Sequence, residues 1–158
     1  MMAAAAEDWN PKLVTHRLVG DVSMAAETVV AAAEAAPEDK PAALIFGGET
    51  TVQLRGQGLG GRNQELALRV AKLGADRLNG DWLFLSGGTD GRDGPTDAAG
   101  GIATPATWAA IKAAGHDPDA LLADNDSFAA LKAAGALLFT GGTGTNVADV
   151  QIFLRRPD

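Results

Sequence analysis

The sequence contains no cysteine in its 158 residues and only two histidines, His16 and His116. Without cysteine there is no disulfide framework, no thiol nucleophile and no thiolate zinc site. The two histidines stand far apart in the sequence, and neither belongs to a catalytic or metal-binding pattern. Redox chemistry at sulfur is therefore excluded, and we expect both histidines to have surface or packing roles.

Positive charge is also in short supply. Lysine and arginine together number 13 against 20 aspartates and glutamates, which gives a formal net charge of −7. Nucleic acids and anionic membranes are bound by basic side chains that neutralise phosphates. The charge balance therefore argues against both as partners.

Long apolar runs are missing as well. No run approaches the roughly 20 residues that a membrane-spanning helix needs. Met1–Ala6 is apolar, but it lacks a basic flank and is followed at once by Glu7 and Asp8, so it does not resemble a signal peptide. The length and the 46% apolar content predict one compact, cytoplasmic domain. The sequence leaves open whether the protein is a homo-oligomer.

Glycine, in contrast, is abundant and unevenly placed. Fifteen of the 20 glycines lie in three short stretches, 47–61, 87–101 and 141–146. Glycine lets the backbone turn sharply or approach a ligand closely. The three stretches are therefore the first candidates for a functional site.

The hydrophobic pattern alternates between short apolar runs and helical periodicity. It predicts, in order, an extended segment over Lys12–Val19, a helix over Val22–Ala36 capped by Asp21 or Ser23, a buried strand over Ala42–Phe46, a half-buried strand over Thr51–Arg55, a helix over Asn63–Leu78, a strand over Trp82–Leu85, a helix starting at Thr104 and Pro105, a helix from Asp126 to Gly135, a strand over Ala136–Thr140 and an outer strand over Val147–Leu154. This order favours a layered α/β fold with a mixed, mainly parallel sheet. In such a fold the glycine-rich loops lie together at the carboxyl ends of the strands, where open α/β sheets bind ligands.

The first glycine stretch supports three interpretations. Gly56, Gly58 and Gly61 have the spacing of a dinucleotide fingerprint, but the strand before them is half polar and the following acidic residue is misplaced. Their backbone N–H groups could instead approach an anion at a helix start, beside Arg62. A plain hairpin tip without a ligand is the third interpretation.

The second stretch, Ser86–Asp97, brings Asp90, Asp93 and Asp97 within eight residues. Carboxylates this close repel unless a cation or hydrogen-bond donors lie between them, so magnesium or a substrate hydroxyl is a reasonable guest. Asp, Gly and Pro are also the residues of tight turns. The third stretch, Thr140–Asn146, lacks the lysine of a P-loop, but its backbone amides could hold an anion. Together the three stretches favour a small, anionic substrate, with proton transfer by a carboxylate.

Five ordered motifs resemble a known family. They are Gly47-Gly48-Glu49-Thr50-Thr51, Gly60-Gly61-Arg62-Asn63-Gln64-Glu65, Gly88-Thr89-Asp90-Gly91 with Asp93-Gly94-Pro95-Thr96-Asp97, Asn125-Asp126-Ser127 and Thr143-Gly144-Thr145-Asn146. From about Ala42 to Leu154 the chain resembles the MOFRL domain, the C-terminal domain of the glycerate 2-kinase family, some of whose members carry the older name hydroxypyruvate reductase. The resemblance implies phosphoryl transfer from ATP to D-glycerate, with Mg²⁺, in a cleft between two α/β domains.

The resemblance also implies the residues of the site. It assigns Glu49, Arg62, Asp90 and Asn146 to catalysis. Arg62 suits a carboxylate or phosphate clamp, and either Asp90 or Glu49 orients or deprotonates the attacking hydroxyl. Substrate or phosphate contacts are expected from Thr50, Gly60, Gly61, Thr89, Asp93, Thr96, Asp97, Thr143, Gly144 and Thr145, and metal contacts from Asp90 and Asp93.

The resemblance divides the chain into two parts. Residues 1–41 form a shortened strand–helix segment packed on the MOFRL-like domain of residues 42–158. The family's large N-terminal kinase domain, which supplies a lysine to the cleft, is expected in cis or in trans. The predicted site has chiefly Arg62 and Arg92 against four carboxylates, so we expect it not to hold nucleotide phosphates unaided.

Three functions follow from these features. The leading hypothesis is the C-terminal catalytic half of an ATP-dependent glycerate 2-kinase. The alternative is a non-catalytic module for sugar-acid binding or assembly, since the partner domain is absent. The third is a hydroxypyruvate reductase, which rests on the glycine spacing alone.

Overall fold

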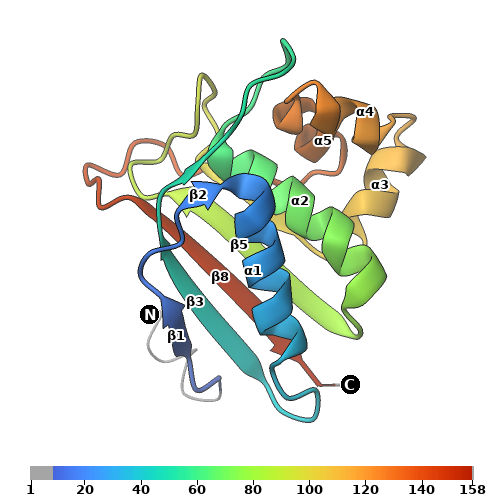
Figure 1. The fold of residues 1–158 in the computed structure, drawn as a ribbon. Helices are drawn as coiled ribbons and strands as arrows, with labels where there is room; N and C mark the ends of the chain where they lie inside the picture. Colours follow the sequence, from blue (N-terminus) through green and yellow to red (C-terminus); the bar gives the residue numbers. More distant parts are fainter. Residues whose placement is uncertain (1–8, 158) are drawn as a thin grey trace.

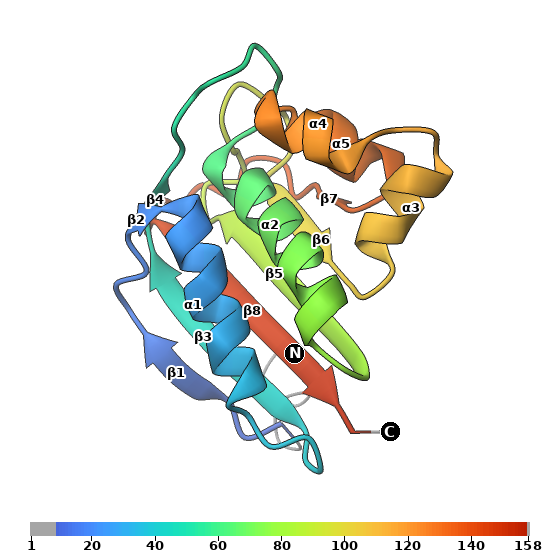
Figure 2. The ribbon, with the colours of Figure 1, turned by 45° about the vertical axis from the view of Figure 1, so that its right-hand side comes forward.

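The computed structural model describes residues 9–157. The strands are β1 Lys12–Thr15, β2 Gly20–Asp21, β3 Ala42–Gly48, β4 Thr50–Thr51, β5 Asp81–Gly88, β6 Gly100–Ala103, β7 Leu137–Leu138 and β8 Asp149–Arg156, and the helices are α1 Val22–Glu34, α2 Arg62–Arg77, α3 Thr107–Ala113, α4 Pro118–Ala123 and α5 Ser127–Ala133. Helices α1 and α2 lie side by side on one face of the main sheet, and α3–α5 gather beside α2 (Figures 1 and 2). The fold is therefore a layered α/β fold, as predicted.

The main sheet has six strands in the order β1-β3-β8-β5-β6-β7, and β2 pairs with β4 in a small second sheet. The pairs β1–β3 and β2–β4 are parallel, whereas the other four pairings of the main sheet are antiparallel. The sheet is thus mixed, but the prediction that it is mainly parallel is wrong. The glycine motifs predict the ends of β3, β5 and β7 to within three residues, but they carry no information about which strands are neighbours.

The glycine loops nevertheless meet at one edge of the sheet. Strands β3 and β5 point the same way (Figure 2). Strand β7 shares their direction, because a single antiparallel strand separates each of the three from the next. Gly48 at the end of β3 and Gly88 at the end of β5 both pair with Asp149, the first residue of β8. The predicted convergence is therefore confirmed, although its topological reason is different.

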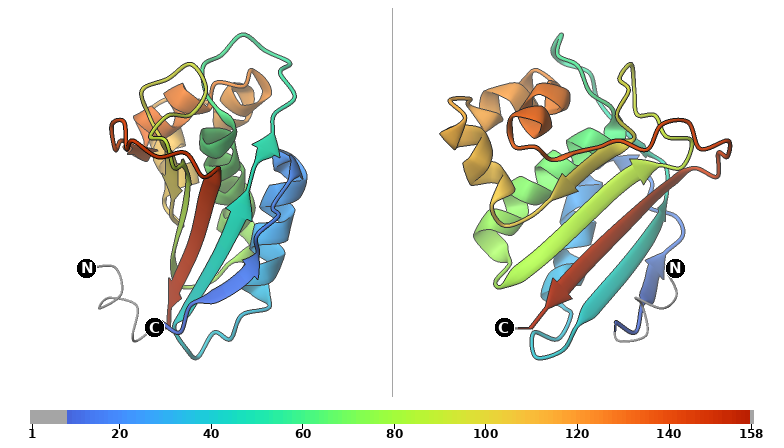
Figure 3. Two further views of the ribbon diagram at one scale, coloured as in Figure 1. Left: turned by 90° about the vertical axis from the view of Figure 1, so that its left-hand side faces the viewer. Right: turned by 180° about the vertical axis from the view of Figure 1, so that it is seen from behind.

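Strand β8 lies in the centre of the sheet, between β3 and β5 (Figure 3). Its alternating pattern of apolar and polar residues predicts an outer strand. In the structure those polar side chains, Asp149, Gln151 and Arg155, are buried on the helix side together with Phe153. The polar residues belong to the interior, so the prediction of an outer strand is wrong.

Two hydrophobic clusters hold the layers together. Helix α1 begins at Val22, where the Asp21 carboxylate accepts a hydrogen bond from the N–H of Ser23 at 2.9 Å, so Asp21 is the cap. Its apolar face packs with α2 over Phe46, Phe84 and Phe153 of the sheet. On its other side α2 packs against α3 and α5. Helix α2 is thus fixed on both sides, and its N-terminus is held at the edge with the glycine loops.

Other local predictions differ from the structure. Thr51–Arg55 is not a continuous strand, because only Thr50–Thr51 pairs and Leu54 is 81% exposed. Helix α3 begins at Thr107 rather than at Thr104, since the N–H of Thr107 closes a turn on the carbonyl of Thr104 first. The segment Met1–Ala6 lies outside the described residues. No helix within 9–157 is long and apolar enough to cross a membrane.

Candidate functional site

A cavity of about 710 Å³ opens at the sheet edge where the glycine loops meet. Five predicted site residues line it, namely Glu49, Thr50, Gly60, Gly61 and Arg62. Thr50 is buried, and its hydroxyl has no hydrogen-bond partner among the described residues. A buried hydroxyl without a partner favours a polar ligand or an ordered water there. We treat this cavity, called the loop cavity below, as the candidate site.

Arg62 is the central cation of the loop cavity. It is the first residue of α2, and its Nε and Nη2 atoms donate to the two carboxylate oxygens of Asp149 at 2.6 and 3.0 Å. Nη2 also lies 3.0 Å from Oε1 of Glu49. The hydrogen bond with Asp149 is the main reason that the pKa of Arg62 is raised. The side chain of Asp149 is 1% exposed and that of Glu49 is 60% exposed, so the first partner is structural and the second is replaceable.

Asp93 caps helix α2 from the second glycine loop. Its carboxylate accepts hydrogen bonds from the backbone N–H of Asn63 at 3.1 Å and of Gln64 at 2.8 Å, and from the side-chain amides of both residues. Asp93 is 3% exposed, and this burial raises the pKa of its carboxyl group, the hydrogen bonds opposing the shift only in part. The structure therefore gives Asp93 a capping role, with both oxygens occupied.

The glycines of the first stretch allow close packing. A Cβ atom on Gly61 would overlap the Asp93 carboxylate, and one on Gly58 would lie 2.6 Å from Cα of Asp126. Gly56 and Gly60 pack equally tightly against Asp124 and Ser127. The fingerprint-like spacing is thus explained by contacts within the protein. No dinucleotide is needed to account for it.

Asn125 connects the first stretch to α2. Its Oδ1 accepts from the N–H groups of Arg55 at 2.6 Å and Gly56 at 3.0 Å, and its Nδ2 donates to the buried Glu65 carboxylate at 3.0 Å. Its φ of 58° is in the left-handed region, which asparagine tolerates better than most residues. Asn125 therefore fixes the wall of the loop cavity.

The second and third loops are bound to each other. The hydroxyl of Thr89 donates to the carbonyl of Ala148 at 2.7 Å and accepts from the N–H of Val147 at 2.8 Å, and the Thr143 hydroxyl donates to the Thr89 carbonyl. Asp90 is half-buried, and its Oδ1 accepts from the N–H of Arg92 at 3.0 Å. These bonds hold the carboxylate of Asp90 at the same sheet edge as Arg62.

The remaining predicted residues lie on the rim of this edge. Thr143, Gly144, Thr145 and Asn146 are all exposed, and so is Asp97. Asn146 accepts from the N–H of Ala148 at 3.3 Å. Thr96 is half-buried and bonds to Gln64 and Asp93 next to the α2 cap. The predicted side chains thus lie at the sheet edge where the glycine loops meet, although not all of them face the loop cavity.

A magnesium ion and a nucleotide place different demands on these residues. The carboxylate of Asp93 is occupied by four donors, and residues 9–157 contain no group of three or more His, Asp and Glu side chains that could hold a metal. Asp90 and Asp93 therefore do not fit Mg²⁺ as a pair. Arg62 is already paired with two carboxylates, so the lining of the loop cavity provides no unpaired cation for a polyphosphate.

Known proteins are similar to this chain in both sequence and fold. The family model described as "MOFRL family" matches residues 42–149. The chain belongs to the MOFRL family. Over 118 residues the MOFRL chain is 58% identical to the D-glycerate 2-kinase of Thermotoga maritima, which covers 75% of this chain and 28% of that protein. It is 54% identical over 122 residues to human glycerate kinase, covering 74% of this chain and 23% of the human one.

Solved structures of relatives share the fold of this MOFRL chain. The crystal structure of glycerate kinase from Thermotoga maritima has a TM-score of 0.88 and 46% identity, covering 98% of this chain and 38% of that one. A Pyrococcus horikoshii protein also has a TM-score of 0.88, with 36% identity, and covers 99% of this chain and 37% of its own. The MOFRL chain thus spans well under half the length of the relatives that it matches.

Sequence reasoning missed three important residues of the MOFRL domain. Asp149 lies in a strand that the sequence predicts to be an outer one, and Asn125 belongs to a motif to which the sequence assigns no role. Glu65 was part of a motif but received no role. The signals for Asp149 were its place directly after a glycine loop and its alternation with Gln151 and Phe153, which share one face of β8.

Proposed function

We propose that this chain is the C-terminal catalytic part of an ATP-dependent glycerate 2-kinase. It would act in a cleft between the sheet edge that carries the glycine loops and a second α/β domain. The two domains together would transfer phosphate from ATP to D-glycerate. The observation that carries the proposal is the convergence of the three glycine loops around Arg62, at one edge of a fold whose relatives are named glycerate kinases. Cytoplasmic location remains part of the same proposal.

Arg62 is suited to bind the carboxylate of glycerate. Asp149 holds two of its N–H groups and fixes the direction of the guanidinium plane, while the exposed Glu49 can be displaced by a substrate carboxylate. A guanidinium presents a planar fork that matches a carboxylate. We therefore assign Glu49 the role of ion-pair partner of Arg62 when no substrate is bound. Asp90 is then the carboxylate that accepts the proton of the attacking hydroxyl.

Asp90 is suited to accept the proton of the attacking hydroxyl. Its carboxylate is fixed through the N–H of Arg92 and lies in the loop that is bonded to Thr143. In the proposed step the hydroxyl oxygen of glycerate bonds to the terminal phosphorus of ATP, the bond from that phosphorus to ADP breaks, and the hydroxyl proton passes to Asp90. Thr89, Thr143, Gly144, Thr145 and Asn146 would contact the transferred group from the rim.

A chimeric enzyme tests this function. Residues 42–149 replace the matched segment of Thermotoga maritima D-glycerate 2-kinase, and phosphorus NMR follows the chimera with ATP, Mg²⁺ and D-glycerate. The proposal expects a phosphoglycerate signal. A folded chimera that forms no phosphoglycerate would refute it. If the unsupplemented 158-residue chain binds glycerate while the chimera stays inactive, the chain is a sugar-acid binding module instead.

A further inference from the structure

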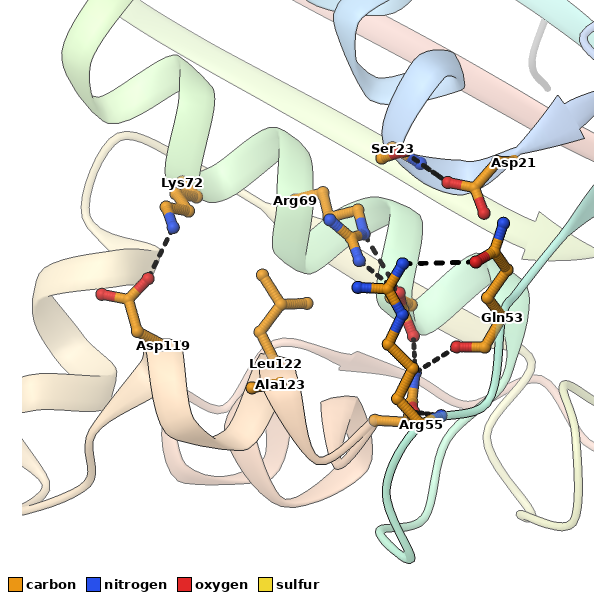
Figure 4. Close-up of a pocket in the computed structure, with 11 residues that line it drawn as sticks. Asp21, Ser23, Gln53, Arg55, Arg69, Lys72, Asp119, Leu122 and Ala123 are labelled. Atoms are coloured by element: carbon orange, nitrogen blue, oxygen red, sulfur yellow. Dashed lines mark hydrogen bonds and ion pairs between the residues drawn. The ribbon is translucent and has the colours of Figure 1, made fainter.

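A second cavity, of about 420 Å³, lies next to the loop cavity. Both cavities are lined by Glu65 and Asn125, whose side chains are hydrogen-bonded at 3.0 Å and form the wall between them. The other walls come from the start of α1, the outer side of α2, the α4 helix and the extended segment 53–55 (Figure 4). This second cavity is called the basic cleft below. It contains none of the predicted site residues.

Three cationic side chains reach the basic cleft from two parts of the chain. Arg69 and Lys72 project from α2, and Arg55 comes from the extended segment opposite (Figure 4). The loop cavity, in contrast, is lined by one arginine, Arg62, which two carboxylates neutralise. The second cavity thus has three cations in its lining, equal in number to its three carboxylates, Asp21, Glu65 and Asp119.

Most of the acidic groups in the basic cleft are already engaged. Glu65 accepts from Arg69 with one oxygen and from Asn125 with the other. Asp21 caps α1, and the pKa of its carboxyl group is lowered, mainly by the hydrogen bonds from Ser23 and to a smaller extent by the charges of Arg69 and Arg55. Asp119 pairs with Lys72 at 2.5 Å, but the two side chains are 55% and 45% exposed. Such an exposed pair contributes little and is easily exchanged.

Arg55 is held in place without an acidic partner. Its backbone N–H donates to Asn125 at 2.6 Å, which fixes its position over the cleft. Its guanidinium donates to the neutral amide oxygen of Gln53 at 3.2 Å. Within residues 9–157 the ion pairs involve Arg62, Arg69, Lys72 and Arg77, and none involves Arg55. A guanidinium at a concave site that makes no ion pair keeps its N–H donors available for an anionic ligand.

We infer that the basic cleft binds a small oxyanion, that is, a phosphate or carboxylate group. Arg55 supplies a guanidinium that makes no ion pair, and Lys72 and Arg69 supply further N–H donors from α2. The guanidinium fork suits both kinds of oxyanion, because each presents two oxygens at matching spacing. This site lies outside the proposed catalytic site, and it does not depend on the kinase function.

Residue-resolved NMR of the 158-residue chain tests the inference at low ionic strength. Inorganic phosphate and D-glycerate are titrated separately while the side-chain Nε–H signals of Arg55 and Arg69 and the backbone N–H of Gly56 are followed. We expect saturable shifts of these signals with at least one of the two anions. Saturation by phosphate alone identifies a phosphate site, and saturation by glycerate alone identifies a carboxylate site. The absence of saturable shifts with both anions would overturn the inference.

Matched variants distinguish a specific binding site from a general attraction of anions to positive charge. Arg55→Gln is expected to weaken binding about tenfold, the loss of one charge-assisted hydrogen-bonded contact. Arg17→Gln removes the same charge from an exposed arginine outside the cleft and is expected to leave binding unchanged. Lys72→Gln, on a different element, is expected to weaken it as well. Equal weakening by Arg55→Gln and Arg17→Gln would contradict a specific site.

Discussion

Arg62 and Asp149 form a two-point ion pair at the place where α2 and β8 both begin. The pair joins the helix layer to the central strand, and the Asp149 side chain is buried beneath it. Since β8 lies between β3 and β5, this contact sits between the first and second glycine loops. The candidate site is therefore organised around the guanidinium group of Arg62, whose orientation is fixed by the buried carboxylate of Asp149.

Replacing Arg62 with lysine should destabilise the domain. An ammonium group cannot make the two parallel hydrogen bonds to Asp149, and it leaves a buried carboxylate incompletely paired. We expect Arg62→Lys to lower the free energy of unfolding by about 1–3 kcal/mol, measured by urea denaturation of the 158-residue chain. Arg92→Lys, an exposed arginine on the same rim, should change it by less than about 0.5 kcal/mol. Similar losses in the two variants would show that the ion pair with Asp149 contributes nothing special.

The cap that Asp93 provides should be visible in stability. Asp93→Asn replaces one acceptor oxygen by an N–H₂ group that faces the N–H groups of Asn63 and Gln64. We expect the variant to lose about 1–3 kcal/mol of unfolding free energy. Asp97→Asn, in the same loop but exposed, serves as the control and should be close to neutral. If Asp93→Asn unfolds at the same urea concentration as the parent chain, the capping role is wrong.

The same carboxyl group makes a prediction about pH. Burial raises its pKa in the folded state above the ordinary value of 3.8. The folded chain therefore binds this proton more tightly than the unfolded chain, and the contribution is fully present below pH 3.8 and lost as the pH rises through the folded pKa. As the pH is lowered from 7, the parent chain should gain stability relative to Asp93→Asn. Urea denaturation at a series of pH values measures this difference, and a difference that moves the other way would contradict the burial argument.

Two glycines should respond in opposite ways to alanine. A Cβ on Gly61 would overlap the Asp93 carboxylate, which is fixed by its donors and cannot withdraw without breaking the α2 cap. We expect Gly61→Ala to cost about 2 kcal/mol or more in unfolding free energy. Gly142→Ala, where no atom lies within 4 Å of the new Cβ, should change it by less than about 0.5 kcal/mol. Thermal unfolding by circular dichroism compares the two, and a tolerated Gly61→Ala would reopen a ligand-binding role for this glycine.

Much of the fold followed from local patterns. The helix over Asn63–Leu78, the helix from Asp126 to Gly135 and the buried runs at Ala42 and Trp82 correspond to α2, α5, β3 and β5. Strand β6 was missed because Gly100 and Gly101 give it almost no apolar signal. Neighbours in the sheet could not be predicted, because hydrophobic periodicity reports which face of a strand is buried but not which strand lies beside it.

The sequence predicts the loops of the candidate site, but not the residues that hold these loops in place. Clustered glycines and carboxylates located the edge around Arg62 and Asp90. The residues that hold this edge, Asp149 and Asn125, act through contacts with segments far away in the sequence. Asp93 shows the converse, because a carboxylate with the appearance of a metal ligand is used inside the protein as a helix cap. Only the three-dimensional arrangement distinguishes these roles.

The most direct test of the proposed catalytic role is the kcat of the chimeric kinase with Asp90→Asn. If Asp90 accepts the proton of the attacking hydroxyl, kcat should fall by at least about 100-fold while the KM for D-glycerate changes little. Asp81→Asn, at the opposite end of the same strand β5, is the matched control and should keep the parent activity. An Asp90→Asn chimera that retains its kcat within a few-fold would contradict the assignment.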